Sequence, residues 1–257
     1  MESYHVMRTH PQLFERSTGA GVYGADALGL IPNKDLDARQ AVHMNIDGLA
    51  RISDGMAGLI HQTEVTVVER LRDMPLPDGA TEAVGAFYAK AMEEITRDAL
   101  ARGAPMFDIL QVAQDFPSKG VEFMFPHYFL LPSFGAMAAY RIRPLTPETC
   151  LFEIWSLVLR PEGERYETPK AATVLPYDSE DFPEIPQQDY ANLPRQQLGL
   201  HDSKFAYMRL SRSTEGMISN YQRLIDGYLA KLDAHTLAKA SNVVNNGYDD
   251  AISDIGF

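Results

Sequence analysis

Two histidines near the N-terminus have the spacing that most strongly suggests chemistry. His5 and His10 are five positions apart, and Pro11 follows directly. On a continuous helix, five residues turn by about 500°, which leaves the two side chains about 140° apart. A residue before proline is pushed out of the helical region. His10 can therefore turn away from a short helix over residues 2–10, and both imidazoles can meet at one metal ion.

The identity of that metal depends on a third ligand. Imidazole binds iron, zinc, copper and nickel alike, whereas two histidines and one carboxylate with open positions are typical of ferrous oxygenases. The chain has 35 Asp and Glu residues, so spacing alone does not select the carboxylate. The alternative is a helix with two surface histidines. A zinc hydrolase is less favoured, because the His-Glu-x-x-His helix is absent.

The elements that must position these residues follow two periodicities. Helical spacing of apolar residues predicts helices over 53–73, 80–102 and 213–232. Runs rich in branched and aromatic residues predict an antiparallel meander of strands over 120–132, 135–144 and 149–161. The fold class is therefore expected to be α+β, an antiparallel sheet with flanking helices and a long C-terminal helix.

The remaining segments are expected to be less regular. Residues 15–35 are glycine-rich and predict a loop, and residues 176–188 predict an acidic loop before a short helix near Gln187 or Gln188. The polar tail after Ala234 is expected to fray. No linker divides the chain, so residues 1–257 are expected to form a single domain.

Composition narrows the partners and the compartment. The formal net charge of −12 argues against nucleic acids and anionic membrane surfaces. The sequence contains no run of about 18 or more apolar residues, so no membrane span is predicted. No signal peptide is recognised either, so a cytoplasmic protein is expected. The one cysteine, Cys150, excludes a disulfide within the chain and a cysteine-held cluster. Cys150 and Trp155 are expected in the core.

Five short segments, in the same order along the chain, match the motifs of one enzyme family. They are Glu2-x-Tyr4-His5-x4-His10, Phe125-Pro126-His127, Tyr140-Arg141-Ile142-Arg143-Pro144-Leu145, Asp189-x-x-Asn192 and the helical stretch 215–229. Together they resemble the catalytic domain of the alpha (large) subunit of Rieske non-haem iron aromatic-ring-hydroxylating oxygenases. The resemblance implies a helix-grip fold of the START/Bet v 1 type, in which a long helix closes a sheet.

The resemblance also implies roles for individual residues. His5, His10 and Asp189 would be the ligands of a mononuclear Fe(II), and Glu2 would connect this iron by hydrogen bonds to the Rieske cluster of a neighbouring subunit. Asn192 would steady Asp189 from outside the ligand set.

A second group of residues would form the substrate pocket. Val6, His127 and Ile185 fall at positions that line this pocket in relatives, although His127 replaces the usual asparagine. The helices at 53–73 and 80–102 would form the roof of the pocket. Phe87 and Met106 are candidate contacts, but plain core packing is favoured for both. Four other histidines fit no ligand spacing and are expected on the surface or in the core: His43, His61, His201 and His235.

The implied reaction is the addition of dioxygen to an aromatic substrate, which gives a cis-dihydrodiol in the dioxygenases of the family. Electrons would come from NAD(P)H through a ferredoxin and reductase chain and a [2Fe–2S] Rieske cluster. That cluster needs two cysteines and two histidines, and one cysteine is present. The Rieske cluster is therefore expected on another domain or chain. This chain, without the N-terminal Rieske domain, is expected to be a fragment or a split subunit. Trimers are implied, with or without a beta subunit.

A non-catalytic function stays open beside the enzyme. The helix-grip fold also serves to hold apolar aromatic ligands without chemistry, and fold alone does not determine function. The combination of both histidines with Asp189 favours the enzyme, because a simple binding module has no use for that arrangement.

Overall fold

The structure is a computed structural model that describes residues 9–10, 36–56, 58–116, 122–166, 171–213, 215–244 and 251–257. Within these ranges the helices are α2 (Ala38–Gly55), α3 (Gln62–Glu69), α4 (Ala80–Ala101), α5 (Ile109–Asp115), α6 (Glu184–Leu200), α7 (Gly216–Leu229) and α8 (Ala234–Val244). The strands are β1 (Glu122–Met124), β2 (Tyr128–Ser133), β3 (Ala136–Thr146) and β4 (Thr149–Val158). The expected α+β class is confirmed. The expected loop over 15–35 lies outside the described residues, as does the expected helix over 2–10 apart from Thr9 and His10.

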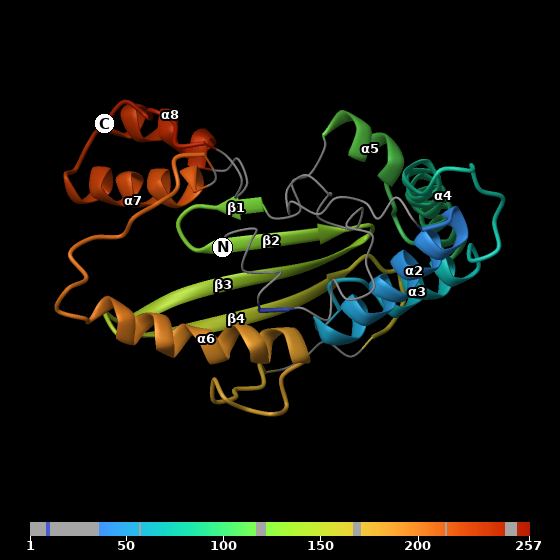
Figure 1. The fold of residues 1–257 in the computed structure, drawn as a ribbon, viewed down its shortest axis with the longest axis horizontal. Coiled ribbons are helices and arrows are strands. Elements are labelled where there is room, and N and C mark those ends of the chain that lie inside the picture. The colour runs from blue at the N-terminus through green and yellow to red at the C-terminus, as the bar shows by residue number, and fades with distance from the viewer. Residues whose placement is uncertain are drawn as a thin grey trace.

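The four strands form one antiparallel meander in the order β1-β2-β3-β4, as predicted. In Figure 1, α6 runs along the β4 side of this sheet, α7 and α8 lie beside β1, and α2, α3 and α4 gather beyond one end of the strands. The expected single strand over 120–132 is wrong in one respect, because a turn at residues 125–127 divides it into β1 and β2. Pro126 offers no backbone N–H for a continued ladder.

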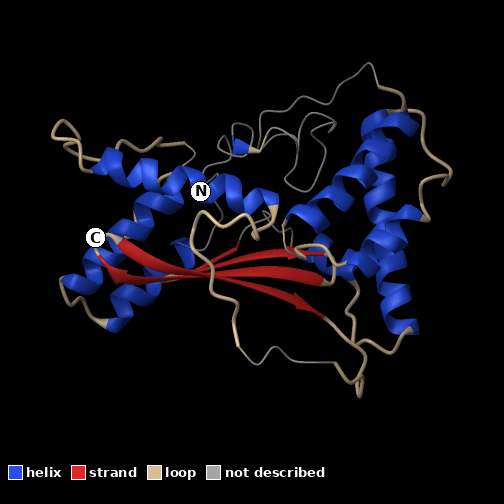
Figure 2. Cartoon of the chain, turned by 90° about the horizontal axis from the view of Figure 1, so that it is seen from below, coloured by secondary structure: helices blue, strands red, loops and turns tan. Residues whose placement is uncertain are grey.

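The inner face of the sheet carries the large apolar side chains. Phe123 on β1 pairs with Phe129 on β2, and Tyr140 on β3 pairs with Ile154 on β4. Tyr221 of α7 meets Phe123 edge to face, with 5.4 Å between the ring centroids. Helices therefore cover this face, and Figure 2 shows the curved sheet nearly edge-on with α6 passing to one side of it.

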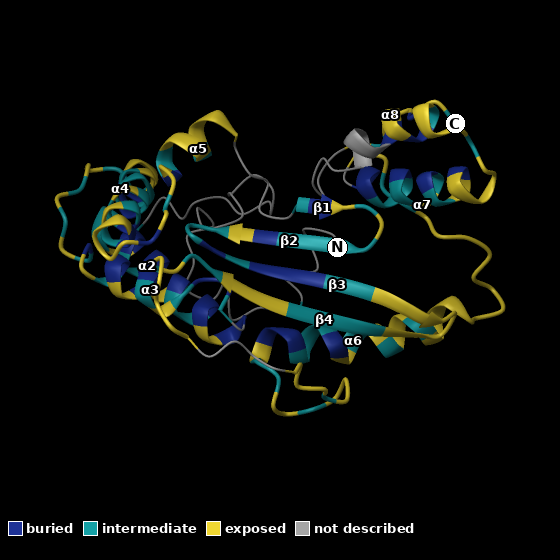
Figure 3. Ribbon diagram, turned by 180° about the vertical axis from the view of Figure 1, so that it is seen from behind, coloured by how far each residue is buried: buried dark blue, intermediate teal, exposed yellow. Residues whose placement is uncertain are grey.

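The exposed parts of β4 correct two expectations for the core. Trp155 is 50% exposed and Cys150 is also exposed. Trp155 pairs with Ala139, one step out of phase with the inward-facing Ile154, because successive side chains alternate between the faces of a strand. Cys150 pairs with Pro144 near the β3–β4 turn, at the margin of the packed region. Figure 3 shows exposed stretches along β4.

The expected helix over 53–73 is also wrong, because two helices occupy this region. Helix α2 ends at Gly55, and Gly58 then adopts a φ of 82°, a left-handed conformation that glycine tolerates best. Helix α3 begins after His61. The side chain of His61 accepts a hydrogen bond from the backbone N–H of Thr63, and the side chain of Glu64 accepts one from the backbone N–H of His61. Most of α2 was not predicted, although its N-cap Asp37 accepts a hydrogen bond from the backbone N–H of Gln40.

One helix is longer than predicted, and another forms where none was predicted. Helix α6 begins at Glu184, before the expected start at Gln187 or Gln188, because Pro186 falls in the first turn, where the missing N–H has no partner to lose. Helix α8 forms where fraying was expected. It starts after Asp233, whose carboxylate accepts from the backbone N–H groups of His235 and Thr236.

The other two helix predictions are confirmed. Helix α4 spans Ala80–Ala101, close to the predicted 80–102, and α7 lies within the predicted 213–232. In the described part of the chain, no helix combines the length and apolar character that crossing a membrane requires.

Candidate metal centre

Four side chains of α6 form one stripe along the helix. Ile185, Gln188, Asp189 and Asn192 stand at positions i, i+3, i+4 and i+7, which share a face of an α-helix. Ile185 at the start of the stripe is 4% exposed. A Cβ added at Gly55 of α2 would lie 3.3 Å from Cδ1 of Ile185. The close approach of α2 thus fixes the first turn of α6.

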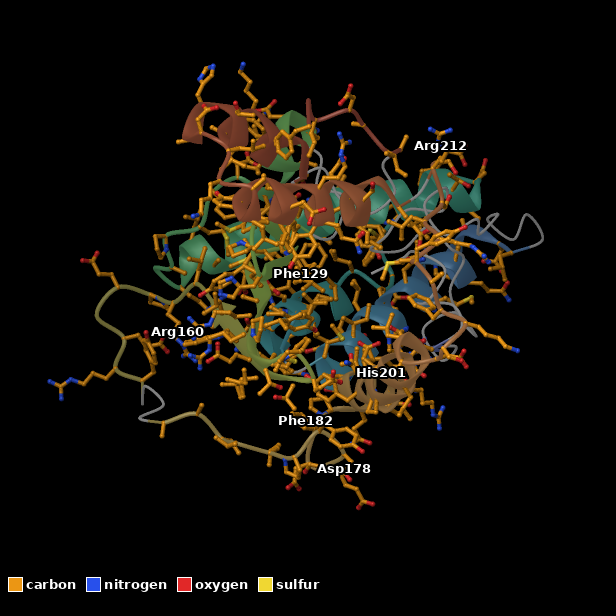
Figure 4. The ribbon with its side chains drawn as sticks, turned by 90° about the vertical axis from the view of Figure 1, so that its left-hand side faces the viewer. Phe129, Arg160, Asp178, Phe182, His201 and Arg212 are labelled. Atoms are coloured by element: carbon orange, nitrogen blue, oxygen red, sulfur yellow. The ribbon has the colours of Figure 1, made fainter. Side chains whose placement is uncertain are left out.

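An aromatic cluster holds the middle of α6 against the sheet. The Tyr190 ring meets Phe152 of β4 with 5.3 Å between centroids, and Phe182 with 5.0 Å. Phe152 in turn contacts Tyr140 of β3. Burial raises the pKa of Tyr190, so its phenol stays protonated. Figure 4 shows Phe182 below the sheet and His201 at the C-terminal end of α6. Because Tyr190 follows Asp189 directly, this packing also holds the backbone of Asp189.

The imidazole of His10 lies against two consecutive residues of this helix. His10 is 3% exposed, so its two ring nitrogens are inside the protein. Nδ1 lies 2.6 Å from Oε1 of Gln188, and Nε2 lies 3.1 Å from Oδ1 of Asp189. The side chain of Asp189 is 25% exposed. His10 and Asp189 are 179 positions apart in sequence. The fold nevertheless brings together one nitrogen and one oxygen that can both bind a metal ion.

Asn192 makes a second connection to the same N-terminal segment. Its Nδ2 donates a long hydrogen bond of 3.4 Å to Oγ1 of Thr9, and it lies 3.3 Å from the carbonyl oxygen of Gln188. Asn192 therefore holds the residue that precedes His10 as well as the helical turn that carries Gln188. Its expected support of Asp189 stays a prediction.

The arrangement of His10 and Asp189 fits a metal ion. A nitrogen and an oxygen that bind one first-row ion at about 2.1 Å and at a right angle are about 3 Å apart. The observed 3.1 Å between Nε2 and Oδ1 matches that separation. Within the described ranges, no group of three His, Cys, Asp or Glu side chains lies close enough to hold a metal. Of the predicted ligands and their neighbours, His5, Glu2 and Val6 lie outside those ranges.

His127 lies in the turn between β1 and β2. Its carbonyl oxygen accepts a hydrogen bond of 3.0 Å from the backbone N–H of Ile142. Ile142 pairs with Phe152, which contacts the Tyr190 ring beside Asp189. His127 and Phe152 thus stand in one row across the sheet. The structure records no contact of His127 with His10 or Asp189 among its described residues.

The residues that were expected to have no part in metal binding make structural contacts. His43 lies 3.0 Å from the carbonyl oxygen of Arg72, and His201 lies 2.8 Å from Glu148 on the surface. Phe87 is fully buried and meets the Tyr88 ring, which favours core packing. Met106 packs against the β2–β3 turn, where its Cε would collide with a side chain at Gly135.

Sequence reasoning missed Gln188 and Thr9. The available signal for Gln188 was its place in the i, i+3, i+4, i+7 stripe with Ile185, Asp189 and Asn192. Thr9 offered only its position beside His10. Neither residue type is a metal ligand, so a search for ligands passes over both.

Comparison with known proteins identifies the family of the chain. Residues 1–231 match the family described as ring hydroxylating alpha subunit (catalytic domain). No curated protein and no solved structure gives a significant match. The matched region includes both predicted histidine ligands, the sheet, α6 and all of α7. The chain therefore belongs to the ring-hydroxylating alpha-subunit family and carries its catalytic domain.

Proposed function

We propose that this chain is the mononuclear-iron oxygenase domain of a Rieske-type ring-hydroxylating enzyme. His5, His10 and Asp189 hold Fe(II), and the reaction adds dioxygen to an aromatic substrate to give a cis-dihydrodiol. The membership of the oxygenase family supports the general reaction. The observation that carries the ligand assignment is the 3.1 Å between Nε2 of His10 and Oδ1 of Asp189.

The protein contributes position and enclosure to this chemistry. When bound, Fe(II) supplies the redox chemistry that activates dioxygen. The burial of His10 keeps bulk water from one ligand, and the Tyr190 anchor keeps the helix that carries Asp189 on the sheet. The partly exposed Asp189 side chain leaves one side of the site accessible. Ligands held on a packed helix are more precise than ligands on a loop.

The proposed substrate pocket adjoins the α6 stripe. Val6, His127 and Ile185 are its proposed contacts. The burial of Ile185 beside Asp189 on α6 and the row that joins His127 to Phe152 support two of these assignments. Ile185 and Phe152 are apolar, which suits an aromatic ring. The residues 1–257 are proposed to act as one catalytic domain.

Electron supply is proposed to come from outside this domain. A [2Fe–2S] Rieske cluster on another domain or chain would receive electrons from NAD(P)H through a ferredoxin and reductase. Glu2 would connect that cluster to the iron. A trimer, with or without a beta subunit, would bring a cluster and an iron together across a subunit boundary.

Iron analysis of purified variants tests the site. The wild type, reconstituted anaerobically with Fe(II) and desalted, is expected to retain about one iron per chain. His10→Ala and Asp189→Ala are expected to lose most of it, because each removes one ligand. His201→Ala is the matched control, since His201 also pairs with a carboxylate, Glu148, but at the surface.

Equal iron in the wild type and in both ligand variants would refute the assignment. Oxygen uptake with an aromatic substrate and a supplied Rieske and reductase system tests the reaction itself. Tight binding of the aromatic compound without oxygen uptake, in protein that holds iron, would favour the non-catalytic binding module.

A further inference from the structure

Gln188 and Asp189 together contact both nitrogens of one buried imidazole. Oε1 of Gln188 lies 2.6 Å from Nδ1 of His10, while Oδ1 of Asp189 lies 3.1 Å from Nε2 on the opposite side of the ring. The ring is 3% exposed, so water does not compete freely for either nitrogen. Both partners are oxygen atoms that accept hydrogen bonds, so a neutral ring satisfies both contacts only when a metal ion takes the place of the proton on one nitrogen.

The contact with the amide oxygen indicates which nitrogen keeps its proton when a metal is bound. Oε1 of a glutamine only accepts hydrogen bonds, so its contact with Nδ1 requires an N–H at Nδ1. A neutral imidazole with its proton on Nδ1 has its lone pair on Nε2, and a metal binds through that lone pair. Nε2 is the nitrogen that faces Asp189. The opposite amide orientation would place the proton on Nε2 and block the metal.

We propose that Gln188 is a positioning residue for the iron site, which holds His10 as the Nδ1–H tautomer and directs Nε2 toward the ion shared with Asp189. This inference rests on the proposed function, because it takes His10 and Asp189 as iron ligands. Hydrogen bonds of this kind orient metal-binding histidines, and their loss typically costs 10–100-fold in metal affinity.

The surroundings of Gln188 support a fixed position. Its carbonyl oxygen lies 3.3 Å from Nδ2 of Asn192, the same atom that reaches Thr9 beside His10. Gln188 also stands one residue before Asp189 on a helix that Tyr190 anchors to the sheet. One rigid helical turn thus carries both the proposed ligand and the group that sets the tautomer of the other ligand.

Three variants separate this role from simple packing. Gln188→Leu keeps the approximate size but removes the acceptor, and Gln188→Glu keeps an acceptor at the same place. Gln197→Leu is the matched control, because Gln197 lies on the same helix and donates a hydrogen bond of 2.8 Å to Glu148 at the surface. Fe(II) affinity is measured anaerobically by calorimetric titration, and thermal unfolding shows that each variant is folded.

Gln188→Leu is expected to weaken Fe(II) binding by about 10–100-fold. Gln188→Glu is expected to stay much closer to the wild type, and Gln197→Leu is expected to equal it. Unchanged affinity in folded Gln188→Leu would overturn the inference. If the wild type itself bound no Fe(II), or bound it as tightly as Asp189→Ala, the proposed function would fail instead.

Discussion

The carboxylate of Glu64, in the first turn of α3, accepts a hydrogen bond of 2.7 Å from the backbone N–H of Gly135 in the β2–β3 turn. Its other oxygen accepts one of 3.0 Å from the backbone N–H of His61. Glu64 is 4% exposed, and burial raises its pKa to about 7, against the opposing effect of these two N–H groups and of Arg102. One buried carboxylate thus connects the helical layer to the sheet.

This pKa predicts a stability that decreases with rising pH. The folded state holds the Glu64 proton up to about pH 7, whereas the unfolded chain releases it near pH 4.5. The folded state therefore binds more protons between these values, and the free energy of unfolding should fall by about 2–3 kcal/mol from pH 4.5 to pH 7. Urea unfolding of the wild type and Glu64→Gln at several pH values isolates this contribution. Parallel pH profiles for the two proteins would contradict the prediction.

The contact between Gly55 and Ile185 predicts a coupled pair of substitutions. A Cβ at position 55 would lie 3.3 Å from Cδ1 of Ile185, which is closer than ordinary contact. Gly55→Ala should therefore gain less than the roughly 0.5–1 kcal/mol that alanine normally contributes within a helix. Ile185→Val removes Cδ1, so the double variant should recover that gain. A double-mutant cycle from urea unfolding measures the coupling, and strict additivity would argue against it.

The Tyr190 ring is predicted to be the main anchor of α6. Tyr190 is 6% exposed and lies between Phe152 and Phe182. Tyr190→Ala should lower the free energy of unfolding by about 3 kcal/mol, as for other buried aromatic side chains. It should also weaken Fe(II) binding if Asp189 is a ligand. Tyr190→Phe keeps the ring and should change stability by roughly 1 kcal/mol or less. Equal stability of both variants would refute the anchor.

The single tryptophan reports on the outer face of the sheet. Trp155 is half exposed, so acrylamide should quench its fluorescence readily in the native chain, with an emission maximum nearer to that of the unfolded protein than to that of a buried indole. Trp155→Gln should change the free energy of unfolding by less than about 0.5 kcal/mol. Protected, blue-shifted emission from the isolated chain would show that the outer face is covered.

The sequence by itself determined the local elements and the family. Periodicity predicted α4, α7 and the antiparallel meander, because the 3.6-residue and two-residue repeats are properties of each segment alone. The histidine pair and Asp189-x-x-Asn192 identified the family that the match over residues 1–231 confirms. The iron ligands themselves stay a prediction.

Only the tertiary structure decided what depends on distant contacts. The apolar pattern over 53–73 did not reveal the break between α2 and α3, where Gly58 adopts its left-handed conformation and its carbonyl oxygen accepts a hydrogen bond from the hydroxyl of Ser156 on β4. The same is true of Trp155, since strand register selects the face on which it lies.

The surroundings of His10 show most clearly what a local sequence pattern does not specify. Its contact with Gln188 joins residues 178 positions apart, and no local pattern specifies which amide reaches which ring nitrogen. A sequence names the residue types that can bind a metal. The packing of α6 on the sheet determines which atoms of those residues face one another.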